Sequence, residues 1–218
     1  GATALTLTAA PSGTVVTIPL TIEQGIAAST TTLSLGSTSF VFGARGTVTA
    51  TANVSAEVPL AGNVEFVIDG TVVATAPLNG GVATASLTLP GSLATGTHQV
   101  LARYTGSATV AASESAATAV TVRAATSRTS LIALPPIHIN GLLPATLIAV
   151  VSQDNGQSVS GKVEFREGSK LVATAQVRNG IATTTLPKQS RGTHRFTAVF
   201  VPTDTANVTG STSSNTTV

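Results

Sequence analysis

The sequence contains no cysteine, no methionine and no tryptophan, and only 9% of its 218 residues are charged. The absence of cysteine excludes disulfide bonds, thiol nucleophiles and thiolate metal sites. Lysine and arginine total 11 against 9 acidic residues, which gives a net charge of +2. The basic residues are scattered along the chain and are not interleaved with aromatics, so the sequence argues against a nucleic-acid groove.

Long apolar runs are also missing, although the mean hydropathy is +0.38. No stretch approaches the roughly 18 uninterrupted apolar residues that a membrane-spanning helix needs. Threonine interrupts every apolar run instead. Because β-branched residues fit the pleated surface of a strand, this composition predicts a soluble β protein without membrane insertion.

Four short motifs occur twice in the same order, which indicates an internal duplication. GNVEF at 62–66 returns as GKVEF at 161–165, VVATA at 72–76 as LVATA at 171–175, NGG at 79–81 as RNG at 178–180, and GTH at 96–98 as GTH at 192–194. Within each copy the apolar residues alternate with polar ones, a period of two that marks antiparallel strands with one face in a core.

The alternation predicts which residues share the core face. In the first copy they are Val64, Phe66, Ile68, Val100, Ala102 and Tyr104, and in the second Val163, Phe165, Phe196, Ala198 and Phe200. Glu65 and Glu164 fall on the opposite face and are predicted to be exposed strand charges. Turn signals such as Asp69-Gly70 and Asn179-Gly180 separate the runs, which predicts about seven strands per copy and a sandwich.

This set of motifs resembles the bacterial Ig-like repeat family of large secreted and cell-surface proteins, over about residues 30–123 and 127–218. The resemblance implies an all-β fold of two tandem immunoglobulin-like sandwiches and an extracellular structural, spacer or adhesive role. It carries no catalytic residues. The second copy departs from the pattern at Pro135-Pro136 and Pro144, where proline predicts an irregular edge.

We therefore expect an N-terminal strand segment at 1–28 and Ig-like domains at 29–123 and 124–218. The first segment has a strand pattern with an apolar face of Val16, Ile18, Leu20 and Ile22 but no domain of its own to bury it. The last strand, which ends at Val218, lacks most of the apolar closing residues of the first copy. This combination suggests head-to-tail strand donation between copies. Two alternatives are that 1–28 is the edge of a preceding repeat, or that it packs onto residues 30–123.

A search for chemistry finds no catalytic, cofactor-binding or metal-binding set. His98 and His194 occupy equivalent positions, and we interpret them as repeat landmarks whose rings meet nearby backbone, because neither has a second ligand at a suitable spacing. His138 also lacks a partner in sequence. Asp154-Asn155-Gly156 is interpreted as a tight turn because too few oxygen ligands follow it for calcium. Three N-glycosylation sequons occur, at Asn53, Asn207 and Asn215.

Three functions remain open from sequence: a non-catalytic building block of an extracellular fibre or surface layer, a spacer within a larger secreted enzyme or adhesin, and a carbohydrate-binding module. The expected partners are other copies of the chain or neighbouring domains of a larger secreted protein. The chain starts at Gly1 without methionine, which suggests removal of a secretion signal or excision from a longer chain. The connection 123–127 is short and has no glycine or proline, so limited bending is expected there.

Overall fold

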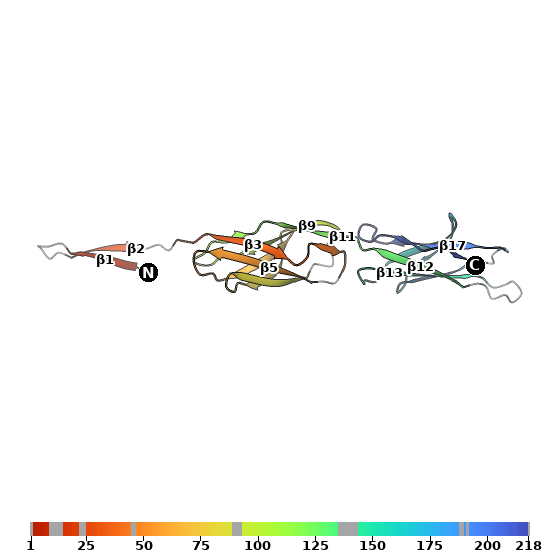
Figure 1. Cartoon of the computed structure of the whole chain (residues 1–218), viewed down its shortest axis with the longest axis horizontal. Coiled ribbons are helices and arrows are strands. Elements are labelled where there is room, and N and C mark those ends of the chain that lie inside the picture. The colour runs from red at the N-terminus through yellow and green to blue at the C-terminus, as the bar shows by residue number, and fades with distance from the viewer. Residues whose placement is uncertain are drawn as a thin grey trace.

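The computed structural model describes residues 2–8, 15–21, 25–44, 47–88, 93–134, 144–187, 190 and 192–217. Every regular element among these residues is a β-strand. Figure 1 shows the strands gathered into a hairpin and two sandwiches that follow one another along the long axis. In the described part of the chain, there is no helix with the length and hydropathy to cross a bilayer. The all-β prediction is confirmed.

The first sandwich consists of two facing sheets. One contains β3 (Ser29–Leu35), β5 (Thr47–Ala56) and β8 (Val82–Thr88). The other runs in the order β4 (Ser39–Val41), β11 (Thr118–Arg123), β9 (Gly96–Tyr104), β6 (Asn63–Ile68) and β7 (Thr71–Pro77), with β10 (Ser113–Glu114) also paired to β9. β4 pairs with β11 in parallel while β3 pairs with β5 antiparallel. The chain therefore crosses between the sheets after β3, as immunoglobulin-like sandwiches do.

The second sandwich repeats this plan. Its smaller sheet contains β12 (Ser127–Leu134), β13 (Thr146–Gln153) and β16 (Ile181–Thr185). Its larger sheet runs in the order β15 (Lys170–Gln176), β14 (Gly161–Glu167), β17 (Arg195–Pro202) and β18 (Ser211–Thr212), with β19 (Thr216–Thr217) also on β17. The predicted irregular edge at Pro135-Pro136, together with His138, lies outside the described residues.

The N-terminal strands β1 (Ala2–Thr8) and β2 (Val15–Thr21) form a two-stranded antiparallel sheet of their own. Their register pairs Leu7 with Val16 and Leu5 with Ile18. Residues 2–8 and 15–21 of the N-terminal segment thus form strands, as the alternation predicts. Ile22, the last residue of the expected apolar face, lies outside the described residues.

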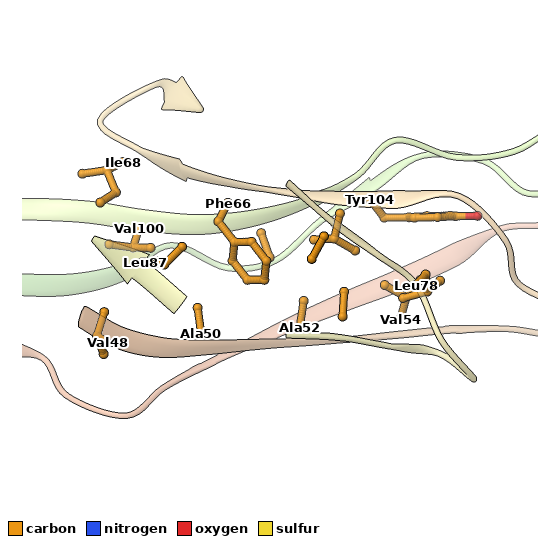
Figure 2. Close-up of a cluster of buried hydrophobic side chains, with 14 of the residues drawn as sticks. Val48, Ala50, Ala52, Val54, Phe66, Ile68, Leu78, Leu87, Val100 and Tyr104 are labelled. Carbon is orange, nitrogen blue, oxygen red and sulfur yellow. The ribbon is translucent and has the colours of Figure 1, made fainter. Parts of the chain in front are cut away.

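The first core places large side chains of one sheet over small ones of the other. Phe66 and Tyr104 are fully buried on the larger sheet, and Ala50 and Ala52 are fully buried on β5. Figure 2 shows the Phe66 ring directed toward the alanine-bearing strand. This complementarity lets the two sheets pack closely against each other. Tyr104 also donates its hydroxyl to the Ala61 carbonyl at 2.6 Å, which satisfies the polar end of the ring.

The second core uses the same layout with three phenylalanines. Phe165, Phe196 and Phe200 come from the larger sheet and are at most 1% exposed. Leu147 and Ala149 on β13 are fully buried opposite them. Together with Phe66 and Tyr104 in the first core, these burials confirm the predicted core faces in both copies. A phenylalanine removed from such a core leaves a cavity that costs about 3–5 kcal/mol.

Each repeat has a buried serine at an equivalent position, and this serine forms hydrogen bonds with the backbone of the larger sheet. Ser115 accepts the backbone N–H of Ala102 at 3.0 Å, and Ser213 accepts that of Ala198 at 2.9 Å. Each serine hydroxyl then donates to a backbone carbonyl nearby, that of Ala116 or Ser214. A buried N–H without an acceptor is costly, so the serine replaces a missing ladder bond.

The glycine that opens the GNVEF and GKVEF motifs is required by geometry. Gly62 has φ +111, and a Cβ there would lie 2.9 Å from the Gly106 carbonyl oxygen. Gly161 has φ +155, and a Cβ there would clash with the Val201 carbonyl oxygen. The motif is thus a site of close strand-to-backbone approach, which only glycine accommodates.

Candidate functional site at the junction between the repeats

Only two residues separate the buried residues on either side of the passage between the repeats. Val122 on β11 is 4% exposed, and Ala125 is fully buried in the second core, so that only Arg123 and Ala124 lie between them. Val41 of β4 also packs against the second core. Phe42 donates its N–H to the Arg123 carbonyl at 2.8 Å. Strand β11 therefore passes into the second repeat without an intervening loop.

Asp154 anchors the passage from the second repeat. Its Oδ2 lies 2.9 Å from Arg123 Nη1 and accepts the Thr126 hydroxyl at 2.7 Å. Its Oδ1 accepts the Thr126 N–H at 2.9 Å, and its own N–H donates to the Thr126 carbonyl. Partial desolvation alone would raise the pKa of Asp154, but the hydrogen bonds from Thr126 and Arg123 outweigh it and lower that pKa below its usual 3.8. The carboxylate is therefore held ionised at neutral pH.

The interpretation of Asp154-Asn155-Gly156 as a tight turn is confirmed. Gly156 has φ +68, and its N–H reaches back to the Gln153 carbonyl. Sequence reasoning did not foresee that the turn is a docking element. Asn155 Nδ2 donates to the Phe42 carbonyl of the first repeat at 3.0 Å. At Gly43, which has φ +69, a Cβ would lie 3.2 Å from Asn155 Nδ2, so the first repeat meets this turn without a side chain.

A separate contact joins the repeats through the loop before β9. Thr95 donates its N–H to Asn207 Oδ1 at 3.0 Å and its hydroxyl to the Ala206 carbonyl at 3.3 Å. Asp204 orients the acceptor, because its Oδ2 accepts Asn207 Nδ2 at 2.9 Å. The Asn207 carbonyl in turn accepts the Ala125 N–H at 2.9 Å. This contact therefore ties the passage to the first repeat a second time.

The three sequon asparagines lie in different surroundings. Asn53 on β5 and Asn215 are exposed. Asn207 is half-buried, and both ends of its side-chain amide are used at the junction. A glycan on Asn207 Nδ2 would compete with its bond to Asp204, whereas Asn53 and Asn215 are accessible to modification.

Each repeat also holds its histidine between a carboxylate and a backbone carbonyl. His98 Nδ1 lies 2.6 Å from Asp69 Oδ2, and its Nε2 lies 2.9 Å from the Ala94 carbonyl oxygen. His194 Nδ1 lies 2.6 Å from Glu167 Oε1, and its Nε2 lies 3.0 Å from the Ser190 carbonyl oxygen. We call these arrangements the His98 clasp and the His194 clasp. Only the backbone half of each clasp was expected from sequence.

Both clasps stabilise the charged ring. The hydrogen bond to Asp69, followed by that to the Ala94 carbonyl, raises the pKa of His98 above 6.5. The bonds to Glu167 and then to the Ser190 carbonyl raise the pKa of His194 in the same way. On the acid side, the Gln99 N–H and then His98 lower the pKa of Asp69.

The carboxylate partners escaped the sequence comparison because they do not align. Ile68 pairs with Thr71 and Val100, and Glu167 with Lys170 and Phe196, so Glu167 occupies the Ile68 position, one before that of Asp69. The longer glutamate side chain makes up the difference. The signal was therefore a carboxylate near the same hairpin turn in both copies, not an identical residue.

The prediction that Glu65 and Glu164 are exposed strand charges needs correction, because both side chains are only partly exposed. Glu65 lies across from Arg103 in the strand register, with 3.7 Å between Oε2 and Nη1. Glu164 is only 17% exposed and pairs with Arg166 at 2.7 Å and Lys162 at 3.3 Å. The hydrogen bonds from Arg166 and then from Lys162 lower the pKa of Glu164, and partial desolvation opposes them. Both glutamates therefore belong to ion pairs across or along the larger sheet.

An open groove of about 1020 Å³ lies between the repeats. Its lining is mostly hydroxyl and amide side chains around one half-buried ring, that of Phe42, with Asp204 as the charged residue among the described lining. Within the described ranges, no group of three or more His, Asp or Glu side chains could hold a metal ion. What the clasps and the junction contain is charge pairs that hold neighbouring loops in position.

Comparisons with solved structures give distant likenesses. The fibronectin(III)-like modules of CbhA from Clostridium thermocellum are 16% identical, with a TM-score of 0.32, and the match covers 85% of this chain and 91% of that one. A 1.5-MDa bacterial ice-binding adhesin is 18% identical, with a TM-score of 0.33 over 89% of this chain and 66% of that one. Likenesses this distant carry no argument about function. No curated protein matches the chain.

The family model for the bacterial Ig-like domain (group 3) matches residues 33–123 and 140–218, one match in each repeat. These matches span most of the chain and contain the motifs, the core phenylalanines and both clasps described above. The chain therefore belongs to the bacterial Ig-like domain (group 3) family.

Proposed function

We propose that the chain is a non-catalytic structural module of an extracellular or cell-surface protein, in which the two Ig-like repeats act as a stiff rod. The observation that carries this proposal is the junction itself. Two core residues, Val122 and Ala125, are separated by only two residues, and the passage is tied to both repeats by side chains. A building block of a fibre or surface layer needs such resistance to bending.

Contacts at separate points around the passage support stiffness better than one contact would. Asn155 binds the Phe42 carbonyl, Thr95 binds Asn207, and Arg123 binds Asp154. A hinge motion that separates these groups would have to lengthen these bonds. Individual surface bonds are weak, but several that share one geometry reinforce each other. We infer a preferred end-to-end arrangement of the kind seen in Figure 1.

Small-angle X-ray scattering tests the rod directly. We expect the maximum dimension and the cross-section to match two sandwiches end to end, with no dependence on protein concentration. A scattering profile that requires a broad mixture of bent and straight forms would overturn the rod. Antibodies against the chain that label intact source cells would support the surface location, and labelling only after permeabilisation would contradict it.

The same rod would serve as a spacer that holds another domain of a longer secreted protein away from the cell. The two roles differ in partner, because a fibre needs contacts between copies whereas a spacer needs none. The mass of the native protein distinguishes them. A native chain near 21.6 kDa that assembles into fibres supports the building block, and a much larger monomeric chain supports the spacer.

Head-to-tail strand donation stays a proposal for how copies would assemble. β2 is paired with β1 along one edge, and among the described strands nothing is paired with its other edge. A hairpin with an unpaired edge can extend a sheet of another copy. Size-exclusion chromatography with light scattering, on the whole chain and on a deletion of residues 1–28, decides this. Oligomers that the deletion abolishes support donation, and monomers in both cases refute it.

Carbohydrate binding is the remaining candidate function. One feature of the groove favours it and another argues against it. Gln153, Gln157 and Ser158 line the groove with neutral donors and acceptors. Sugar-binding faces usually stack several aromatic rings, but Phe42 is the aromatic residue among the described lining. A glycan-array signal that Gln153→Ala and Gln157→Ala abolish would favour this function over the rod alone.

A further inference from the structure

The two clasps share their chemistry but differ in what their loops touch. The His98 clasp fixes the Ala94 carbonyl, and the next residue, Thr95, makes both hydrogen bonds to the second repeat. The His194 clasp fixes the Ser190 carbonyl on the second repeat, and Ser190 makes its described hydrogen bonds to His194 alone. His98 is therefore linked to the junction by a continuous path of bonds. His194 makes the same kind of clasp without that link, so it serves as an internal control.

The path from the ring to the junction can be followed bond by bond. His98 Nε2 meets the Ala94 carbonyl oxygen at 2.9 Å, Thr95 N–H meets Asn207 Oδ1 at 3.0 Å, and Asn207 Nδ2 meets Asp204 Oδ2 at 2.9 Å. The His98 side chain is 14% exposed, so the ring has little freedom to turn away. Any change in the His98–Ala94 bond is thus transmitted to a residue that holds the repeats together.

Protonation of His98 decides whether both of its bonds can exist. Both partners, the Asp69 carboxylate and the Ala94 carbonyl, are acceptors, so both ring nitrogens must carry a proton. A neutral ring has one N–H. The carboxylate bond is charge-assisted and stronger, so the remaining proton stays on Nδ1. Nε2 then presents a lone pair to the Ala94 carbonyl, and that bond is lost.

We propose that the His98 clasp is a pH-sensitive lock on the junction, which holds Thr95 against Asn207 when the ring is charged and releases it when the ring is neutral. The inference rests on the proposed rod function and adds its regulation. The rod is stiffer on the acidic side of the His98 transition and more flexible on the basic side. A surface protein with this lock would change its reach with the pH of its surroundings.

The charges around His98 support a single-site transition. From the β6–β7 turn, Asp69 faces the ring; on β11, the residue paired with His98 is Val120. The loop side contributes Leu93, Ala94 and Thr95, which have no charge.

The charged groups at the junction are already paired with other residues. Arg123 comes directly after the β11 residue that pairs with Gly96, and its guanidinium binds Asp154. Across the junction, Asp204 binds Asn207 and has its pKa lowered chiefly by that side-chain bond. Asp69 and Asp204 both stay ionised while His98 titrates.

The test is the hydrogen-exchange protection of the Thr95 amide in the full chain, measured by NMR between pH 5.5 and 9 and corrected for intrinsic exchange. Loss of one hydrogen bond predicts a fall in protection of about fivefold through the His98 transition. His98→Gln should remove the transition, and the matched His194→Gln should retain it. Asp69→Asn should weaken the transition, because without the carboxylate a neutral ring can keep its proton on Nε2 and its bond to the Ala94 carbonyl, a result that a merely structural role would not produce.

Each outcome of these measurements either supports or overturns the proposed lock. Constant Thr95 protection across the His98 titration overturns the lock, as does an equal effect of His194→Gln. Scattering at pH 5.5 separates this failure from failure of the rod. A single extended form at pH 5.5 with constant Thr95 protection leaves the rod standing without the lock. A broad mixture of bent forms at pH 5.5 refutes the rod.

Discussion

The guanidinium of Arg123 lies 2.9 Å from the carboxylate of Asp154. Arg123 ends the last strand of the first repeat, and Asp154 begins a turn of the second. The same carboxylate binds Thr126 through two further bonds, so one side chain holds the beginning and the end of the passage. This relation joins the two repeats through side-chain contacts at the junction.

Asp154→Ala should therefore loosen the junction and weaken the second repeat. We expect a loss of about 1–2 kcal/mol in the unfolding free energy of the second repeat, because hydrogen bonds to a partly exposed charge are removed. Urea denaturation measures this loss. The control is Glu114→Ala, which removes an exposed ion pair with Arg103 inside the first repeat and should leave the junction unchanged. An equal effect of both substitutions would argue against the role of Asp154.

The clasps predict that stability falls as the pH rises above 6.5. The pKa values of His98 and His194 are raised above 6.5, so their contributions are fully present below pH 6.5 and are lost as pH rises through the folded pKa values. Urea midpoints measured from pH 5.5 to 9 should fall over that window. The double variant His98→Gln and His194→Gln should flatten the curve, and a curve as steep as that of the unmodified chain would exclude the histidines as its source.

The equivalent phenylalanines predict separate losses in the two repeats. Phe66→Ala should destabilise the first repeat by about 3–5 kcal/mol, and Phe165→Ala the second by a similar amount, because each leaves a cavity in a closed core. Tyr104 should report only the Phe66 loss, since the second repeat contains no tyrosine. Tyrosine fluorescence and hydrogen exchange, taken together, distinguish the two. Simultaneous loss of both repeats in either variant would show one shared folding unit.

The buried serines predict a smaller effect with a clear structural cause. Ser115→Ala leaves the buried N–H of Ala102 without its acceptor, and we expect a cost of about 1–3 kcal/mol. Ser113→Ala is the control because that half-buried hydroxyl bonds to the hydroxyls of Ser29 and Thr31 and not to a buried amide. Thermal denaturation compares the stability lost in the two variants. Equal losses would contradict the explanation that the Ala102 N–H needs Ser115 as its acceptor.

The core and the turns could be predicted from the sequence because each follows from local chemistry. Alternation placed Phe66 and Phe165 inside, and positive φ at Asp69 and Asn179 agrees with the two-residue hairpins expected from Asp-Gly and Asn-Gly. The parallel pairing of β4 with β11 could not be predicted, since it depends on the chain crossing between sheets.

The junction and the carboxylate half of each clasp could not be predicted from sequence, for the same reason. Thr95 and Asn207 are 112 residues apart, and His98 and Asp69 are 29 apart, so no local pattern connects them. Asn207 was noticed only as a sequon, and Asp154 only as a turn residue. Their roles come from the meeting of two folded surfaces, which neither repeat encodes alone.

The stiffness of the junction can be measured most directly as a distance distribution between the repeats. The chain has no cysteine, so Thr84→Cys and Thr183→Cys, both exposed on equivalent strands, give two clean spin-label sites. Pulsed electron paramagnetic resonance at pH 5.5 should show one narrow distance peak, which Asp154→Ala broadens. A broad distribution in the unmodified junction, unchanged by Asp154→Ala, would contradict the rod.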